Sequence, residues 1–165
     1  MIHFGKANLR RGSNIIMLVG PPACGKTTFA SEIMSDYSDI EWAYISPNGI
    51  RKQFVKDGAE SISSKMVFDK VYKDIEAALK DGKNVIYDAT NCNKQYRKKI
   101  MRFIDDKCNQ AVCLVSAATL TDCLRRNGTF SRPMKEDLIE RIYIELWSNP
   151  PDISEGYSMI ATFCV

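Results

Sequence analysis

One stretch decides the fold: Ile15-Ile16-Met17-Leu18-Val19-Gly20-Pro21-Pro22-Ala23-Cys24-Gly25-Lys26-Thr27-Thr28. Its first five residues are all apolar, as expected for a parallel strand that is covered on both faces. Residues 29–34, which follow it, have the pattern of a helix. A buried strand, a glycine-flanked loop and a helix start are the context in which G-x-x-x-x-G-K-[ST] becomes a phosphate cradle. The sequence therefore predicts a phosphate-binding loop, and with it a nucleotide-binding protein.

This loop supplies the predicted contacts to the nucleotide, which we expect to be ATP. Backbone N–H groups of the loop and of the first helical turn favour an anion, as does the helix dipole. Lys26 adds a positive charge for the β- and γ-phosphates, and the Thr27 hydroxyl is suited to a magnesium ion. The residues predicted to bind the nucleotide are Gly20, Ala23, Cys24, Gly25, Lys26, Thr27 and Thr28.

Length and composition indicate one compact domain in a chain of 165 residues. We divide it into a basic N-terminal arm, residues 1–13 with Lys6, Arg10 and Arg11, and a domain over residues 14–165. No apolar run is long enough to span a membrane. Six cysteines without a C-x-x-C pair favour free thiols and a cytoplasmic protein. The only histidine, His3, lies in the arm, so a catalytic histidine is not expected.

Strands and helices alternate along the rest of the chain. Further strands are predicted at 42–46, 84–88, 111–117 and 157–165, with a turn at Pro47-Asn48-Gly49 and a helix over 50–55. The helix after the third strand is expected to keep Tyr96 on its apolar side and to turn a basic cluster mostly outward, whose members are Lys94, Arg97, Lys98, Lys99 and Arg102. This order predicts an α/β fold, an open parallel sheet of about five strands with helices on both faces.

Polar residues follow several of these strands, and ligands of such sheets bind beyond the carboxyl ends of the strands. Asp88 closes an apolar strand, where a carboxylate can hold magnesium. Asn48 and Arg51 are three residues apart, so on one helix they face the same way. The loop 128–133 has the character of a lid, and Arg132 at its end or Arg126 before it can bring positive charge to the phosphates, with Arg132 favoured.

Several motifs together resemble the phage and bacterial polynucleotide 5′-hydroxyl kinase family, over nearly all of residues 14–165. They are the phosphate loop, Ile45-Ser46-Pro47-Asn48-Gly49-Ile50-Arg51, Tyr87-Asp88-Ala89-Thr90-Asn91 with Arg97 after it, Cys123-Leu124-Arg125-Arg126-Asn127 and Glu155-Gly156-Tyr157.

The resemblance implies a P-loop kinase fold and transfer of the ATP γ-phosphate to the 5′-hydroxyl of DNA or RNA, in nucleic-acid repair. It implies that Lys26, Thr27 and Asp88 bind the ATP phosphates and magnesium. It also implies that acceptor binding falls to Asn48, Arg51, Thr90, Asn91 and Arg97.

The sequence departs from the family pattern at two positions. Asn48 stands where the family has an aspartate that acts as general base, and an amide cannot accept the proton of a hydroxyl. The lid arginine of the family falls on Phe130, so Arg132 or Arg126 is expected to replace it.

Three explanations of Asn48 remain open at this point. The asparagine is an introduced change that traps substrates, or it marks a silenced kinase that binds without transferring phosphate, or the base lies elsewhere, with Asp88 nearest. Two other functions stay open beside the polynucleotide kinase. One is a P-loop kinase of a nucleoside, nucleotide or small metabolite, and the other is a non-catalytic module that binds ATP or nucleic acid.

Overall fold

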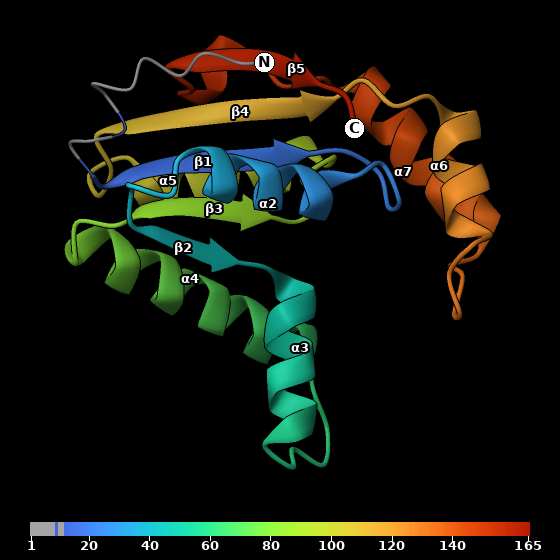
Figure 1. The fold of residues 1–165 in the computed structure, drawn as a ribbon, viewed down its shortest axis with the longest axis horizontal. Helices are drawn as coiled ribbons and strands as arrows, with labels where there is room; N and C mark the ends of the chain where they lie inside the picture. The colour runs from blue at the N-terminus through green and yellow to red at the C-terminus, as the bar shows by residue number, and fades with distance from the viewer. Residues whose placement is uncertain (1–8, 10–11) are drawn as a thin grey trace.

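The computed structural model describes Leu9 and residues 12–165 (Figure 1). The elements are β1 (Asn14–Val19), α2 (Lys26–Asp36), β2 (Trp42–Ile45), α3 (Pro47–Lys56), α4 (Ser64–Lys80), β3 (Asn84–Asp88), α5 (Lys94–Ile104), β4 (Gln110–Ser116), α6 (Leu120–Asn127), α7 (Glu136–Ser148), the 3₁₀ turn η1 (Ile153–Glu155) and β5 (Met159–Phe163).

The strands form one parallel sheet in the order β2-β3-β1-β4-β5. Because all five run in the same direction, their carboxyl ends meet at one edge, and Leu18 of β1 pairs there with Asp88 of β3. The phosphate loop leaves β1 at this edge. The predicted α/β fold with a five-stranded parallel sheet is confirmed.

Alternate residues of the central strand face two different cores, which explains why β1 is apolar throughout. Ile15 and Met17 face a core that includes side chains of α4, α5 and α7. Ile16 and Leu18 face the core beneath α2. Helices therefore cover both faces of the sheet, as predicted.

The helix after β2 begins earlier than the sequence analysis expected. The predicted turn at Pro47-Asn48-Gly49 is wrong, because α3 starts at Pro47 itself. The hydroxyl of Ser46 caps the helix by accepting a hydrogen bond from the Gly49 backbone N–H at 3.0 Å. Proline suits the first helical position, where its fixed φ fits and its missing N–H is not needed. Asn48 and Arg51 consequently share one helix from its first turn.

The predicted N-terminal arm falls mainly outside the described residues, because 1–8 and 10–11, with His3, Lys6, Arg10 and Arg11, are not among them. Leu9 is buried in the core on the α2 face of the sheet. Among Leu9 and residues 12–165, none of the helices has the length and apolar character needed to cross a membrane.

Packing of α4 against the sheet should contribute strongly to stability. Ile75 is fully buried in the core of that face. We expect Ile75→Ala to lower the free energy of unfolding by about 2–5 kcal/mol, because it removes buried methyl groups and leaves a cavity. Urea denaturation measures this. Met66 on the same helix is 43% exposed, so Met66→Ala is the matched control, with an expected change within about 0.5 kcal/mol. Equal losses in the two variants would contradict the described packing of α4.

Candidate active site

The loop between β1 and α2 has the backbone of a phosphate cradle. Gly25 precedes the helix with φ of 96°, a conformation that side-chain-bearing residues rarely adopt. A Cβ at Gly25 would also lie 3.0 Å from the Cβ of Val165. The loop thus depends on glycine at this position for both its backbone conformation and its packing.

Lys26 places its ammonium group inside this loop. It is the first residue of α2, and Nζ donates hydrogen bonds to the carbonyl oxygens of Gly20 at 2.9 Å and Pro21 at 2.8 Å. The side chain is only 9% exposed. A positive charge held at the N-terminus of a helix, beside a glycine-bearing loop, is the arrangement that binds phosphate.

Asp88 joins the phosphate loop to two neighbouring strands. Its Oδ2 accepts a hydrogen bond from the Thr27 hydroxyl at 2.6 Å and another from the Tyr44 hydroxyl at 2.6 Å. Partial burial, followed by the hydrogen bond to Asp88, raises the pKa of Tyr44, so the phenol keeps its proton and remains a donor. Sequence reasoning missed Tyr44. No local pattern in the sequence points to it, because the contact depends on β2 lying beside β3 in the sheet.

A hydroxyl and a carboxylate are oxygen ligands of the kind that Mg²⁺ prefers. Among the described residues no group of three or more His, Cys, Asp or Glu side chains could hold a metal. Mg²⁺ is usually bound by one or two carboxylates together with substrate phosphates. The donor set of Thr27 and Asp88 therefore suits a nucleotide-bound magnesium ion.

The start of α3 carries the expected pair of polar side chains. Asn48 is exposed and Arg51 is partly buried, and the guanidinium of Arg51 donates a long hydrogen bond, 3.4 Å, to the Asn48 side-chain oxygen. The helix follows β2 directly, so the pair lies at the same edge of the sheet as the phosphate loop (Figure 1). The amide of Asn48 is thereby oriented by the arginine that shares its face of the helix.

The segment after β3 forms hydrogen bonds with the end of β1 and the start of the phosphate loop. The carbonyl oxygen of Thr90 accepts a hydrogen bond from the Gly20 N–H at 2.9 Å, and the side-chain nitrogen of Asn91 donates to the Leu18 carbonyl at 2.7 Å. Asn91 has a positive φ of 50° and is buried. Its amide nitrogen is thus already engaged with β1, whereas Thr90 is exposed and accessible to an acceptor.

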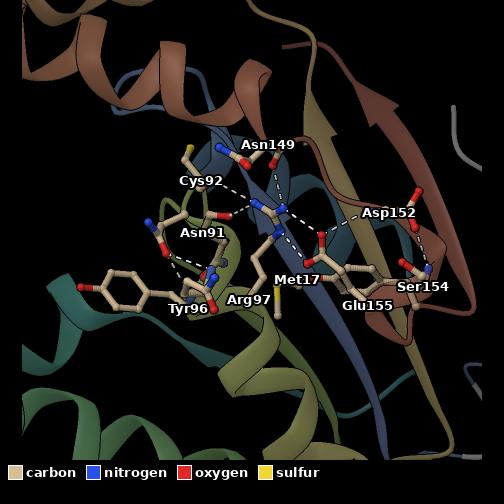
Figure 2. Close-up of polar contacts among 12 residues, drawn as sticks. Met17, Asn91, Cys92, Tyr96, Arg97, Asn149, Asp152, Ser154 and Glu155 are labelled. Carbon is tan, nitrogen blue, oxygen red and sulfur yellow. Dashed lines mark hydrogen bonds and ion pairs between the residues drawn. The ribbon is translucent and has the colours of Figure 1, made fainter.

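Arg97 does not lie in the basic surface where the sequence analysis expected it. Its side chain is fully buried, while Tyr96, predicted on the apolar side, is 68% exposed. Figure 2 shows the guanidinium between Glu155 and the backbone. Nε and one Nη donate to the two Glu155 oxygens at 2.9 Å each, and further N–H groups reach the carbonyls of Asn91, Cys92 and Asn149.

Each of the five guanidinium donors has an acceptor inside the protein. The expectation that Arg97 contacts an acceptor substrate is therefore corrected. It fixes the segment that carries Thr90 and Asn91, and it does so from within the core.

The lid segment places its two arginines differently. Arg126 lies near Gly25. Its Nη2 donates a hydrogen bond to the Val165 carbonyl at 2.6 Å, and its Nη1 is 3.4 Å from the position that a Cβ added to Gly25 would occupy. Asn127 is buried and bonds both the N–H and the carbonyl of Met134, which closes the base of the loop 128–133. Arg132 is exposed within that loop. The structure brings Arg126, rather than the favoured Arg132, to the phosphate loop.

These features define a class of protein, that of the proteins with a P-loop, the phosphate-binding loop between a strand and a helix. A family model described as an AAA domain matches residues 15–137, which is more than half of the chain, and the chain belongs to that family. A comparison with curated proteins gave no match.

Solved structures share the fold. A chain of the Pnkp1/Rnl/Hen1 RNA repair complex is similar with a TM-score of 0.72 and 20% identity over 88% of this chain, which spans about half (47%) of that chain. A gluconokinase from Sinorhizobium meliloti 1021 matches with a TM-score of 0.60 and 14% identity, over 94% of this chain and 85% of that one. Chaetomium thermophilum Kti12, solved with ADP-AlF3, has a TM-score of 0.59 and 19% identity, over 91% and 88%.

The buried ion pair of Arg97 and Glu155 can be tested for its contribution to the stability of the segment after β3. Both side chains are 0% exposed, so Glu155→Gln would leave the Arg97 charge uncompensated in the core. We expect the free energy of unfolding to fall by about 3–5 kcal/mol, measured by urea denaturation. The exposed pair of Lys65 and Asp69 provides the control, since Asp69→Asn should leave the midpoint unchanged within error. A Glu155→Gln protein as stable as this control would show that the ion pair does not hold the segment.

Proposed function

We propose that this protein is an ATP-dependent phosphotransferase that moves the γ-phosphoryl group of ATP to the 5′-hydroxyl of a DNA or RNA end. One observation carries the proposal. The phosphate loop, the Thr27–Asp88 pair and the Asn48–Arg51 pair lie together at the carboxyl edge of the sheet. In this proposal the first two form the donor side and the Asn48–Arg51 pair forms the acceptor side, and in-line phosphoryl transfer requires the two sides to be adjacent.

The donor side consists of the loop, Lys26 and Thr27. In this proposal the Lys26 ammonium turns from the carbonyls of Gly20 and Pro21 toward the β- and γ-phosphates. Thr27 and Asp88 would hold Mg²⁺, which when bound would neutralise charge on the phosphates. Arg126, beside Gly25, adds positive charge at the outer end of the loop.

The acceptor side consists of Asn48, Arg51 and Thr90. Arg51 is suited to binding the phosphate next to an acceptor hydroxyl, because a guanidinium can donate two parallel hydrogen bonds to a phosphate. Asn48 can orient the acceptor hydroxyl but cannot take its proton.

The six cysteines are free thiols, which agrees with a reducing compartment such as the cytoplasm.

Asp88 is poorly placed to replace the missing base. Its Oδ2 already accepts hydrogen bonds from Thr27 and Tyr44. In this proposal the carboxylate also holds a metal ion, so both of its oxygens already have partners. Of the three explanations of Asn48, an introduced change and a silenced kinase therefore fit the site better than a base at Asp88.

Asn48→Asp is the decisive variant. We expect it to raise 5′-phosphorylation of a hydroxyl-ended oligonucleotide by about 10²–10⁴-fold, because it supplies a general base in the position that faces the acceptor. The measurement is transfer of label from γ-labelled ATP. Gln53→Glu, an exposed position on the same helix, controls for the added negative charge and should leave the rate unchanged.

Two outcomes of this assay would replace the proposal. Labelling of a nucleoside or a sugar but of no oligonucleotide would indicate a small-molecule kinase, which the near full-length similarity to a gluconokinase favours as the second candidate. Binding of MgATP without transfer to any acceptor, even with aspartate at position 48, would indicate a non-catalytic module.

The two lid arginines should affect different kinetic constants. Arg126 lies beside the phosphate loop, so Arg126→Ala should raise KM for ATP. Arg132 is exposed in the loop 128–133, and in this proposal it reaches the transferring group when the loop closes, so Arg132→Ala should lower kcat by about 10²-fold with little change in KM. Steady-state kinetics in the Asn48→Asp background measure both. Arg125, which pairs with Asp122 on the surface, is the control. An unchanged kcat in Arg132→Ala would remove Arg132 from the reaction.

A further inference from the structure

Tyr44 forms a hydrogen bond with a residue of the candidate metal site, and the proposed function gives Tyr44 no role. It stands one residue before the end of β2, and β2 pairs in parallel with β3, with Ile45 opposite Tyr87. This register brings the phenol to the carboxyl end of β3. There the Tyr44 hydroxyl lies 2.6 Å from the Asp88 Oδ2, the same oxygen that accepts from Thr27.

Core packing does not explain this contact. Tyr44 is 38% exposed, and it belongs to neither of the two buried cores on the faces of the sheet. Asp88, in contrast, is only 7% exposed. The tyrosine thus reaches inward from the surface and donates to a buried carboxylate, which is a specific polar role rather than a filling of apolar space.

The two hydrogen bonds restrict how Asp88 can turn. Thr27 comes from α2 and Tyr44 from β2, so the carboxylate is held from two separate elements. One carboxylate oxygen is engaged by both donors, which leaves the other oxygen for a cation or for water bound to it. Groups of this kind, which orient a metal ligand without touching the metal, typically change metal affinity or activity by about 10–100-fold when removed.

We infer that Tyr44 is a positioning residue that orients the Asp88 carboxylate for the magnesium ion of a bound nucleotide. The inference rests on the proposed nucleotide and metal binding, and it does not depend on which acceptor the enzyme uses. Tyr44 donates a hydrogen bond throughout and does not exchange a proton. Thr27 alone would leave the carboxylate free to rotate about its single remaining contact.

Tyr44→Phe tests this inference through binding rather than turnover. The experiment titrates Mg²⁺ at a fixed ATP concentration and follows nucleotide binding by calorimetry, and it repeats the ATP titration in EDTA. We expect Tyr44→Phe to require about 10-fold more Mg²⁺ for half-maximal binding, with metal-free ATP binding unchanged. Tyr72→Phe, which removes a phenolic hydroxyl from a ring packed edge-to-face on Phe103, should behave as the unmodified protein.

A double-mutant cycle with Asp88→Ala separates positioning from a general effect on the fold. If Tyr44 acts through Asp88, the Tyr44→Phe change should add nothing to the Mg²⁺ requirement once Asp88 is alanine. An equal effect of Tyr44→Phe in both backgrounds would overturn the inference, as would an unchanged Mg²⁺ requirement in the single variant. Nucleotide binding that does not respond to Mg²⁺ in the unmodified protein would overturn it too.

A failure of the Tyr44 inference can be distinguished from a failure of the proposed 5′-hydroxyl kinase activity. Absence of transfer to a 5′-hydroxyl would leave the Mg²⁺ titration interpretable, because binding is measured without an acceptor. Thermal melting of each variant checks that the fold is retained, and the partly exposed position of Tyr44 favours this.

Discussion

The buried ion pair between Arg97 and Glu155 is the interaction on which the geometry of the site depends. It joins two segments 58 residues apart and takes up every guanidinium donor together with three backbone carbonyls. Two of those carbonyls belong to Asn91 and Cys92, in the segment that supports the phosphate loop. A buried pair is weak support for net stability, but it specifies one arrangement, because each charge has few alternatives inside a core.

A chain of contacts extends from this pair to the phosphate loop. Thr90, beside the fixed carbonyls, accepts the hydrogen bond of Gly20, and Asn91 donates to the end of β1. Asp88 closes β3, the strand before this segment, and accepts a hydrogen bond from Thr27 of α2. The proposed donor side of the site is thus tied to the core by hydrogen bonds, whereas α3 and the α6–α7 segment flank it on either side (Figure 1). In the proposed phosphoryl transfer, this arrangement suits a reaction whose catalysis is mainly positioning.

Local patterns were sufficient to predict the α/β fold and the phosphate loop. The apolar run of β1 and the G-x-x-x-x-G-K-T spacing are each contained in a few consecutive residues, so no distant contact is needed to recognise them. The contact between Arg51 and Asn48 follows from their spacing on one helix.

Long-range contacts account for what the sequence did not predict. Helical periodicity predicts that an arginine lies on the surface. No residue near Arg97 in the sequence indicates that it forms a buried ion pair with Glu155. Tyr44 was missed because its partner Asp88 depends on the order of strands in the sheet. Of the two arginines expected to supply the lid charge, Arg132 was favoured, but the structure places Arg126, near the end of α6, beside Gly25.

The proposed function rests on binding of the ATP phosphates by the loop around Lys26. Calorimetric titration of MgATP into the protein and into a Lys26→Ala variant tests it most directly. We expect saturable binding with one nucleotide per chain, and we expect it to be about 10–100-fold weaker when the ammonium is removed, as for hydrogen bonds to a charged group. Equal affinity in the two proteins, or no binding by the unmodified protein, would contradict it.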